Sequence, residues 1–315
     1  MDFIGIGIQF ILLIVGFVLL IKGSDFFVDG SSNIASILKI PTLIVGLTIV
    51  AFGTSAPEAA VSITSSLSGN NALAVSNVIG SNLFNMMLII GLCALLRELK
   101  IGRDVLNKDL PFLVVITAIL SGFIIIGWSI SRVEGIILFL LIIGYVSYLV
   151  YSAKKTKEAQ IVEKPKMGLL RSIIYIIGGM AGIIIGADFV VDSASYIAMA
   201  FGMSETLVGL TIVAIGTSLP ELVTSLTALK KEENQLIIGN VIGSNIFNIL
   251  FVLGASSIIS PITINPNMIV DIALMLGVTI LFFIFGKTQD KYDKKEGFIL
   301  VALFIAYMAF AIMRN

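Results

Sequence analysis

Long apolar runs, each about the length that crosses a lipid bilayer, constrain this chain more than any other feature. A hydrocarbon core about 30 Å thick requires roughly 20 apolar residues of helix, and a spanning segment must satisfy its own backbone hydrogen bonds. Ten such runs can be marked, approximately at residues 3–21, 41–66, 71–96, 110–128, 133–151, 169–190, 205–229, 235–258, 267–286 and 297–313. Residues 22–40 are semi-polar and are expected to extend or cap the first helix. We therefore predict an all-α membrane protein with ten transmembrane helices.

The composition excludes several classes of protein. With 57% hydrophobic and 13% charged residues, the chain fits no soluble class. It has no histidine and one cysteine, Cys93, which argues against histidine-based catalysis and transition-metal chemistry. We expect no enzyme, because no HExxH motif or nucleophile elbow is present. Acidic and basic residues number 20 each, so no nucleic-acid partner is expected. The lipid bilayer is the expected environment, and a monomer is the simplest assembly.

The positions of the basic residues predict the orientation in the membrane. Of the 20 lysines and arginines, 18 fall in every second connection, and only Arg132 and Arg314 do not. The positive-inside rule therefore places those connections in the cytoplasm and both chain termini outside the cell membrane. The longest polar connection, 152–168, is expected to be a cytoplasmic linker between two five-helix halves, 1–151 and 169–315.

The two halves repeat each other in sequence. Residues 23–91 align with 186–254 at a constant shift of 163, with 33 identities in 69 positions. The best-preserved segments are VGLTIVAFGTSAPE over VGLTIVAIGTSLPE and NVIGSNLFN over NVIGSNIFN, within motifs at residues 45–91 and 208–254. Five spans are an odd number, so the second half enters the membrane in the opposite sense. The sequence therefore predicts an inverted-topology repeat.

Each repeat places a glutamate, Glu58 or Glu221, near the middle of an apolar span. A charge at that depth costs on the order of 2.5 to 3.5 kcal/mol even on the lenient insertion scale, so the pair requires compensation. Pro57 and Pro220 precede the two glutamates and remove a backbone N–H, so each span is expected to break or kink there. Broken helices that line a cavity offer carbonyl oxygens to ions, as in transporters.

The side chains around each glutamate present only oxygen. Hydroxyls and amides recur at helical spacing in both repeats, at Thr54, Ser55, Ser81 and Asn85 and at Thr217, Ser218, Ser244 and Asn248. Small polar residues can also serve close helix packing, an alternative that remains open above all for Asn82 and Asn245. All-oxygen coordination suits Ca²⁺, whose charge two carboxylates balance. The same pocket can hold Na⁺, another hard cation, so one site could bind either ion in turn.

The motifs GTSAPE with GSNLFN and GTSLPE with GSNIFN resemble the two alpha repeats of the Na⁺/Ca²⁺ exchangers in the cation/calcium antiporter superfamily. The resemblance implies a midplane site in which Glu58 and Glu221 bind Ca²⁺ with the carbonyls of Thr54 and Thr217. It implies that Na⁺ sites use further hydroxyls and carbonyls, those of Ser55, Ser81, Ser218, Ser244, Ala51 and Ala214. It also implies that the first and sixth helices slide together to switch access.

One departure from the family pattern leaves the coupling ion open. Many sodium-coupled members have an acidic residue at one of the positions corresponding to Asn85 and Asn248, whereas this chain has asparagine at both. We expect an antiporter that exchanges Ca²⁺ for Na⁺ by alternating access, without a prosthetic group. A Ca²⁺/H⁺ exchanger is the alternative, because two glutamates could carry protons. A cation channel is a further alternative, although inverted repeats with broken helices favour alternating access.

Overall fold

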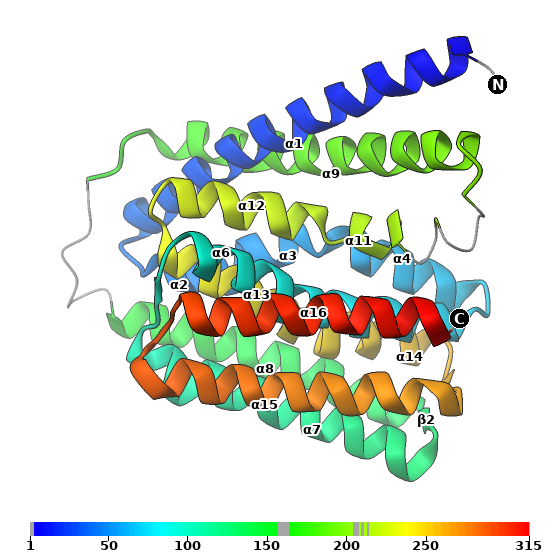
Figure 1. Ribbon diagram of the computed structural model, residues 1–315. Helices are drawn as coiled ribbons and strands as arrows, with labels where there is room; N and C mark the ends of the chain where they lie inside the picture. The colour runs from blue at the N-terminus through cyan, green and yellow to red at the C-terminus, as the bar shows by residue number, and fades with distance from the viewer. Residues whose placement is uncertain (1–2, 157–163, 204–207, 209–210, 213, 315) are drawn as a thin grey trace.

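The protein forms a bundle of long helices that run along one common direction (Figure 1). The computed structural model describes residues 3–156, 164–203, 208, 211–212 and 214–314. Within these residues, eight helices are long and apolar enough to cross a membrane. Five of them are the single helices α1 (Phe3–Leu38), α8 (Arg132–Thr156), α9 (Leu169–Ala200), α15 (Ile269–Gln289) and α16 (Lys294–Arg314).

The other three long helices each contain a π-helical turn. They are α5 (Asn71–Leu83), η2 (Phe84–Ile89) and α6 (Ile90–Leu96); η3 (Val105–Asp109) and α7 (Leu110–Gly127); and α13 (Asn234–Phe247), η5 (Asn248–Val252) and α14 (Leu253–Ile259). A π-turn inserts an extra residue per turn, and it is frequent at functional sites. The turns η2 and η5 occupy matching places in the two repeats.

Two further segments are broken rather than continuous. The first comprises α2 (Thr42–Val45), η1 (Gly46–Val50) and α3 (Ala51–Thr54), followed by α4 (Ala56–Leu67) after a bend of 49°. In the second, α11 (Ala214–Gly216) is followed by α12 (Leu219–Lys230). The expected span 205–229 lies partly outside the described residues, so ten spans remain a prediction. The semi-polar stretch 22–40 extends the first helix, and the helix expected at 169–190 continues to Ala200.

Two short strand pairs join the halves, a feature that the all-α expectation did not include. Antiparallel pairs link β1 (Leu99–Lys100) to β4 (Lys291–Tyr292) and β2 (Ser129–Ile130) to β3 (Ile262–Thr263), while η6 (Pro266–Met268) precedes α15. The strands β1 and β3 are related by the 163-residue shift, yet each pairs with a strand of the other half. The polar backbone of the connections is thereby satisfied between the halves.

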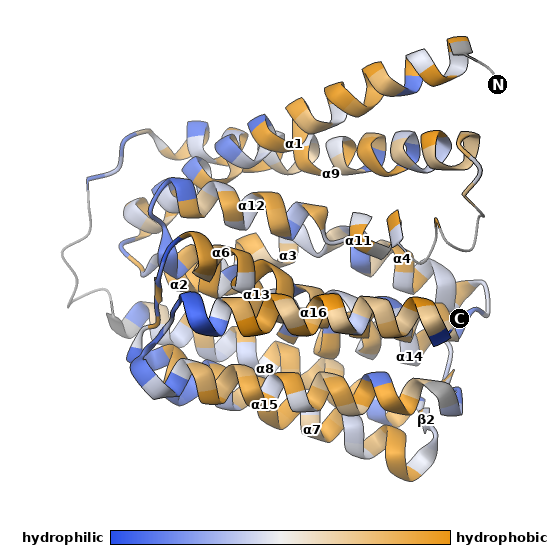
Figure 2. Ribbon diagram, viewed as in Figure 1, coloured by the Kyte–Doolittle hydropathy of each residue, from blue (hydrophilic) through white to orange (hydrophobic). Residues whose placement is uncertain are grey.

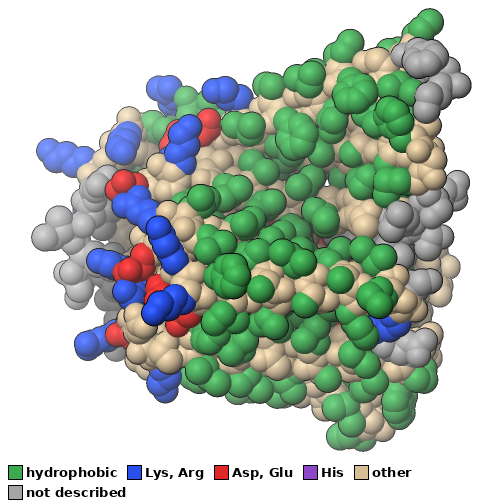
Figure 3. All heavy atoms as spheres, viewed as in Figure 1, with side chains coloured by type: hydrophobic (Ala, Val, Ile, Leu, Met, Phe, Trp, Pro, Cys, Tyr) green, Lys and Arg blue, Asp and Glu red, His purple; other side chains and the backbone are tan. Residues whose placement is uncertain are grey.

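Charge gathers at one end of the bundle, which we call the charged end (Figure 3). The charged end is hydrophilic, whereas the middle of the bundle is hydrophobic (Figure 2). It comprises the connections at residues 38–41, 97–104, 230–233 and 287–294 and the ends of α8 and α9 that adjoin residues 157–163. Arg97 and Glu232 form an ion pair of 3.0 Å there, and the guanidinium lowers the pKa of Glu232. Both termini lie at the other end, the opposite end (Figure 1). This apolar belt between polar ends is the expected form of a multi-pass membrane protein.

The helices α1 and α9 pack antiparallel along a seam of glycines. A Cβ atom added at Gly23 would lie 2.8 Å from the carbonyl oxygen of Gly179, and one added at Gly186 would lie 2.7 Å from the backbone nitrogen of Leu20. Such close backbone approach is how small residues allow helices to associate in lipid. These two helices lie beside the rest of the bundle in Figure 1, and α1 leaves much of its apolar surface exposed to the lipid.

The adjacent glycines of α9 provide a test of this seam. A Cβ atom at Gly179 would lie 2.6 Å from the backbone nitrogen of Phe27, whereas one at Gly178 would meet no heavy atom within 4 Å. We predict that Gly179→Ala lowers the melting temperature in detergent by several degrees, since overpacking costs about 1 to 3 kcal/mol. Gly178→Ala is the matched control and should leave stability unchanged or raised, because alanine favours helix. Equal melting temperatures for the two variants would contradict the conclusion that α1 and α9 pack through close backbone contact at these glycines.

Candidate cation-binding site

The two helix breaks have the same local structure. The helix α3 ends at Thr54, Ser55 has φ −85° and ψ 9°, and α4 then begins with Pro57 in its first turn. In the second half, Ser218 has φ −93° and ψ 6°, and α12 begins with Pro220 in its first turn. Because proline has no N–H, neither can donate to the carbonyl four residues before it. The expected interruption is confirmed at both positions.

The two glutamates follow these breaks, and each is bound by a serine of the other half. Both side chains are fully buried, at 0% exposure. The hydroxyl of Ser218 donates to Oε1 of Glu58 at 3.1 Å, and that of Ser55 donates to Oε1 of Glu221 at 2.8 Å. Ser81 also lies 3.4 Å from Oε1 of Glu58 and 3.2 Å from Ser218. The structure therefore brings the two breaks and their carboxylates together in one buried polar cluster.

Four asparagines pair across the halves beside the carboxylates. The side-chain nitrogen of Asn85 donates to Oδ1 of Asn245 at 3.1 Å, and that of Asn248 donates to Oδ1 of Asn82 at 3.2 Å. Asn85 lies in η2, and Asn248 begins η5. Asn82 and Asn245 therefore accept the N–H groups of Asn248 and Asn85 across the halves, an arrangement that leaves Oδ1 of Asn85 and Oδ1 of Asn248 without a donor. The packing alternative for Asn82 and Asn245 stays open beside this contact.

Four buried oxygens in this cluster accept no hydrogen bond from any described residue. They are Oε2 of Glu58, Oε2 of Glu221, Oδ1 of Asn85 and Oδ1 of Asn248, two pairs related by the 163-residue shift. A buried acceptor without a partner costs about 1 to 3 kcal/mol, and more when it is charged, so such a group calls for an explanation. A cation bound among these oxygens supplies one. Two carboxylates with two amides form a hard, all-oxygen donor set of two negative charges, as Ca²⁺ prefers.

The remaining predicted residues surround this cluster. The hydroxyl of Ser244 lies 3.5 Å from the carbonyl oxygen of Ala51, which also accepts the N–H of Ser55 at 3.0 Å. Ala214 begins α11. Thr54 and Thr217 contact two asparagines to which the sequence analysis assigned no role, Asn240 and Asn77. The signal was present in the sequence, because each begins a repeated NVIGSN segment.

The two sides of the cluster differ in exposure. Thr54 and Asn240, on the side of the charged end, are 1% and 0% exposed. Their counterparts Thr217 and Asn77, on the side of the opposite end, are only half-buried. Equivalent residues of the two halves therefore differ in exposure, with the more exposed pair toward the opposite end, while both carboxylates are fully buried.

A buried cluster of carboxylates, hydroxyls and amides between two broken helices of an apolar bundle is typical of membrane transporters of cations. The chain matches the family described as sodium/calcium exchanger protein over residues 8–152 and 171–313. It therefore belongs to the sodium/calcium exchanger protein family and is a cation/calcium antiporter of the membrane. The resemblance noted from the GTSxPE and GSNxFN segments is confirmed.

Similar proteins match over nearly the whole chain. The putative antiporter CaxA of Alkalimonas amylolytica is 38% identical over 313 residues, covering 94% of this chain and 96% of that protein. The sodium/calcium exchanger MaX1 of Methanosarcina acetivorans is 30% identical over 346 residues, covering 96% and 98%. A solved structure of the sodium-calcium exchanger NCX_Mj, soaked with Na⁺ and Sr²⁺, superposes with a TM-score of 0.86 at 31% identity, covering 96% of this chain and 99% of that chain.

The unpartnered oxygens predict that cations stabilise the fold. Ca²⁺ at about 100 times its Kd should stabilise the protein by about 2.7 kcal/mol, which raises the melting temperature measured in detergent. Glu221→Gln removes one of the two buried charges and should abolish most of this increase. Glu98→Gln, at an exposed ion pair with Lys291, is the matched control and should retain it. An equal Ca²⁺-dependent increase in the Glu221 variant would exclude this carboxylate as a ligand.

Proposed function

We propose that this protein exchanges Ca²⁺ for Na⁺, with both ions binding in turn at the buried cluster around Glu58 and Glu221. The observation that carries the proposal is the set of four buried oxygens without hydrogen-bond donors. Their two formal charges match one Ca²⁺, and the adjacent hydroxyls of Ser55 and Ser218 can add neutral ligands. The two carboxylates balance one Ca²⁺ or two Na⁺ equally, so either load leaves the buried site neutral.

The full proposed ligand set contains the twelve residues that the repeated motifs and the family resemblance indicate. Ca²⁺ would contact the two carboxylates with the carbonyls of Thr54 and Thr217. Na⁺ would in addition use the hydroxyls and carbonyls nearby, those of Ser55, Ser81, Ser218, Ser244, Ala51 and Ala214, while Asn85 and Asn248 would contribute amide oxygens. Competition for shared ligands is the physical basis of antiport, because occupation by one ion excludes the other.

Alternating access would move the ions across the membrane, with α1 and α9 sliding together against the remaining helices of the two inverted halves. Two observations support it. The helices α1 and α9, which are sequence equivalents, run antiparallel, as inverted repeats require. The residues flanking the cluster are also buried on the side of the charged end and only half-buried on the side of the opposite end. By the positive-inside rule the charged end would face the cytoplasm, so the more exposed side of the cluster would face outside.

Flux measurements in liposomes test the coupling ion. Liposomes that contain the purified protein and are loaded with Na⁺ should accumulate ⁴⁵Ca²⁺ when diluted into Na⁺-free medium. A pH gradient imposed without Na⁺ should drive no ⁴⁵Ca²⁺ uptake. Liposomes with Glu58→Gln or Glu221→Gln should show no Na⁺-driven uptake, because half of the buried charge is lost. Uptake driven only by the pH gradient would replace Na⁺ with H⁺, and flux without any counter-ion would indicate a channel.

A further inference from the structure

Two asparagines outside the proposed ligand set connect each broken helix to the other half. Oδ1 of Asn240, in α13, lies 3.0 Å from the hydroxyl of Thr54, which is also 3.1 Å from the carbonyl oxygen of Val50 in its own segment, and the side-chain nitrogen of Asn240 donates to Ser225 at 3.2 Å. Asn77, in α5, repeats this arrangement by donating to Ser62 at 3.0 Å. Each asparagine thus joins a serine of its own half to a threonine at the break in the other half.

The second bridge is longer than the first. Oδ1 of Asn77 lies 3.5 Å from the hydroxyl of Thr217, at the limit of a hydrogen bond. This bridge lies on the more accessible side of the cluster, and both of its residues are half-buried. The side-chain nitrogen of Asn77 also donates to the backbone carbonyl of Glu58 at 3.2 Å, so the bridge reaches the carboxylate residue itself.

We propose that Asn77 and Asn240 are positioning residues for ion binding, a role that rests on the proposed function. A threonine whose hydroxyl is held from the opposite half has a fixed backbone, and its carbonyl is then directed toward the shared site. The bridge also fixes one half against the other, because its two ends belong to different repeats. Close backbone packing supports this, since a Cβ atom at Gly243 would lie 2.8 Å from the carbonyl oxygen of Leu47.

A double-mutant cycle tests this role. Thr54→Val keeps the carbonyl and removes only the hydroxyl, while Asn240→Ala removes the other end of the bridge. If the hydroxyl acts through Asn240, we predict that each variant weakens Ca²⁺ binding about tenfold and that the double variant is no weaker than either, because coupled residues are not additive. Thr48→Val, which removes a hydroxyl that donates to the carbonyl of Ile44 in the same broken segment and lies outside the proposed ligand set, is the matched control and should bind Ca²⁺ like the wild type. The readout is equilibrium ⁴⁵Ca²⁺ binding by purified protein.

The outcomes separate the alternatives. The positioning role would be overturned if the double variant lost Ca²⁺ affinity by the product of the two single fold-changes. Unchanged Ca²⁺ affinity in Asn240→Ala would also overturn it. A lower melting temperature with unchanged affinity would assign the asparagine to folding alone, which also overturns it. Absence of Ca²⁺ binding by the wild-type protein would instead contradict the proposed function. The pair Thr217→Val and Asn77→Ala should show the same non-additivity with smaller effects, because that contact is longer.

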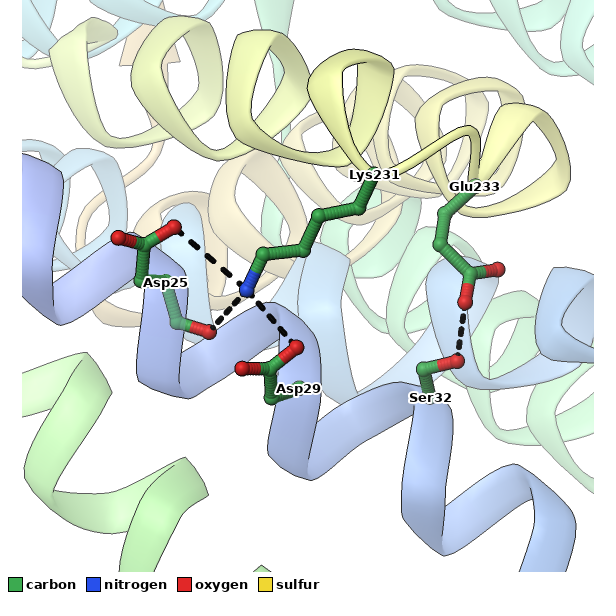
Figure 4. Close-up of polar contacts among 5 residues, drawn as sticks. All are labelled: Asp25, Asp29, Ser32, Lys231 and Glu233. Atoms are coloured by element: carbon green, nitrogen blue, oxygen red, sulfur yellow. Dashed lines mark hydrogen bonds and ion pairs between the residues drawn. The ribbon is translucent and has the colours of Figure 1, made fainter. Parts of the chain in front are cut away.

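A separate cluster of ionic contacts fastens α1 at the charged end (Figure 4). Nζ of Lys231, in the turn after α12, lies 2.8 Å from Oδ1 of Asp29 and 3.5 Å from Oδ1 of Asp25, and it donates to the carbonyl oxygen of Asp25 at 2.8 Å. The hydroxyl of Ser32 donates to Glu233 in the same turn. One turn of the bundle therefore contacts two successive turns of α1.

Among the residues that the structure describes, no basic side chain forms the equivalent ion pair with α9. The acidic residues recur there as Asp188 and Asp192, at the positions that correspond to Asp25 and Asp29. The turn that corresponds to Lys231 instead has Ser68, followed by a glycine and an asparagine. The repeat has thus kept the acidic pair in both halves and a basic partner at the charged end alone.

We infer that Lys231 is a clamp that favours closure of the charged end. This inference also rests on alternating access, in which α1 and α9 move against the remaining helices. Opening at the charged end would separate α1 from the turn that carries Lys231, and the contacts with Asp25 and Asp29 would be lost. The uncharged turn at Ser68 offers no equivalent contact, so the two conformations are held unequally.

Thiol labelling tests the clamp in detergent solution. Ser31, on the clamped part of α1, is 0% exposed, so Ser31→Cys in a Cys93→Ala background reports exposure of this region. We predict that Lys231→Gln increases the labelling rate several-fold, whereas Lys230→Gln, at the adjacent exposed residue, does not. Ser68→Lys should also increase labelling, because it offers Asp188 and Asp192 a partner when the opposite end closes.

The second variant excludes a local explanation. If Lys231→Gln merely loosens its own surroundings, then Ser68→Lys at the far end of the bundle will leave the labelling rate unchanged, and the clamp is refuted. Unchanged labelling in Lys231→Gln would also refute it. Lys231→Gln, Lys230→Gln and Ser68→Lys should all retain Na⁺-driven ⁴⁵Ca²⁺ uptake, since none of these residues touches the ion cluster. Uptake driven by another ion would bear on the proposed function alone.

Discussion

Two carboxylates buried inside an apolar bundle are the constraint on which the rest of this structure depends. An ionised group at that depth is tolerated only with a partner, and Glu58 and Glu221 have no basic residue beside them among the described residues. The serines and amides around them supply only part of the compensation. The helix breaks and π-turns occur where these groups converge, because continuous helices would present fewer free oxygens. The cation proposed to bind there would complete the arrangement.

The halves of the bundle are interdependent at the atomic scale. Ser55 contacts the glutamate of the other half, Ser218 does the same in return, and the asparagine pairs also cross between halves. Glycines make this crossing possible, since a Cβ atom at Gly239 would lie 2.7 Å from the carbonyl oxygen of Leu43. Each glutamate therefore depends on a hydroxyl of the other half, so small movements between the halves would change the surroundings of both carboxylates together.

The departures from symmetry carry as much information as the repeat. A perfectly symmetric pair of halves would be equally stable open to either side. Here Thr54 is buried and Thr217 is half-buried. Lys231 forms an ion pair with Asp29 of α1, whereas its counterpart Ser68 has no charge to pair with α9. Under the proposed alternating access, these contacts would favour closure of the charged end, since a modest difference in contact energy shifts populations several-fold.

The sequence by itself determined the apolar helices, the breaks at Pro57 and Pro220 and the buried acids, because hydropathy and the missing proline N–H act locally along the chain. It also predicted the charged end, since basic residues gather in alternate connections. Tertiary structure alone decided that Ser55 binds Glu221 rather than Glu58, that Asn82 and Asn245 orient the amides, and that two strand pairs join the halves. These contacts connect residues far apart in the chain, so they depend on how closely the glycine-lined helices approach and not on any local pattern.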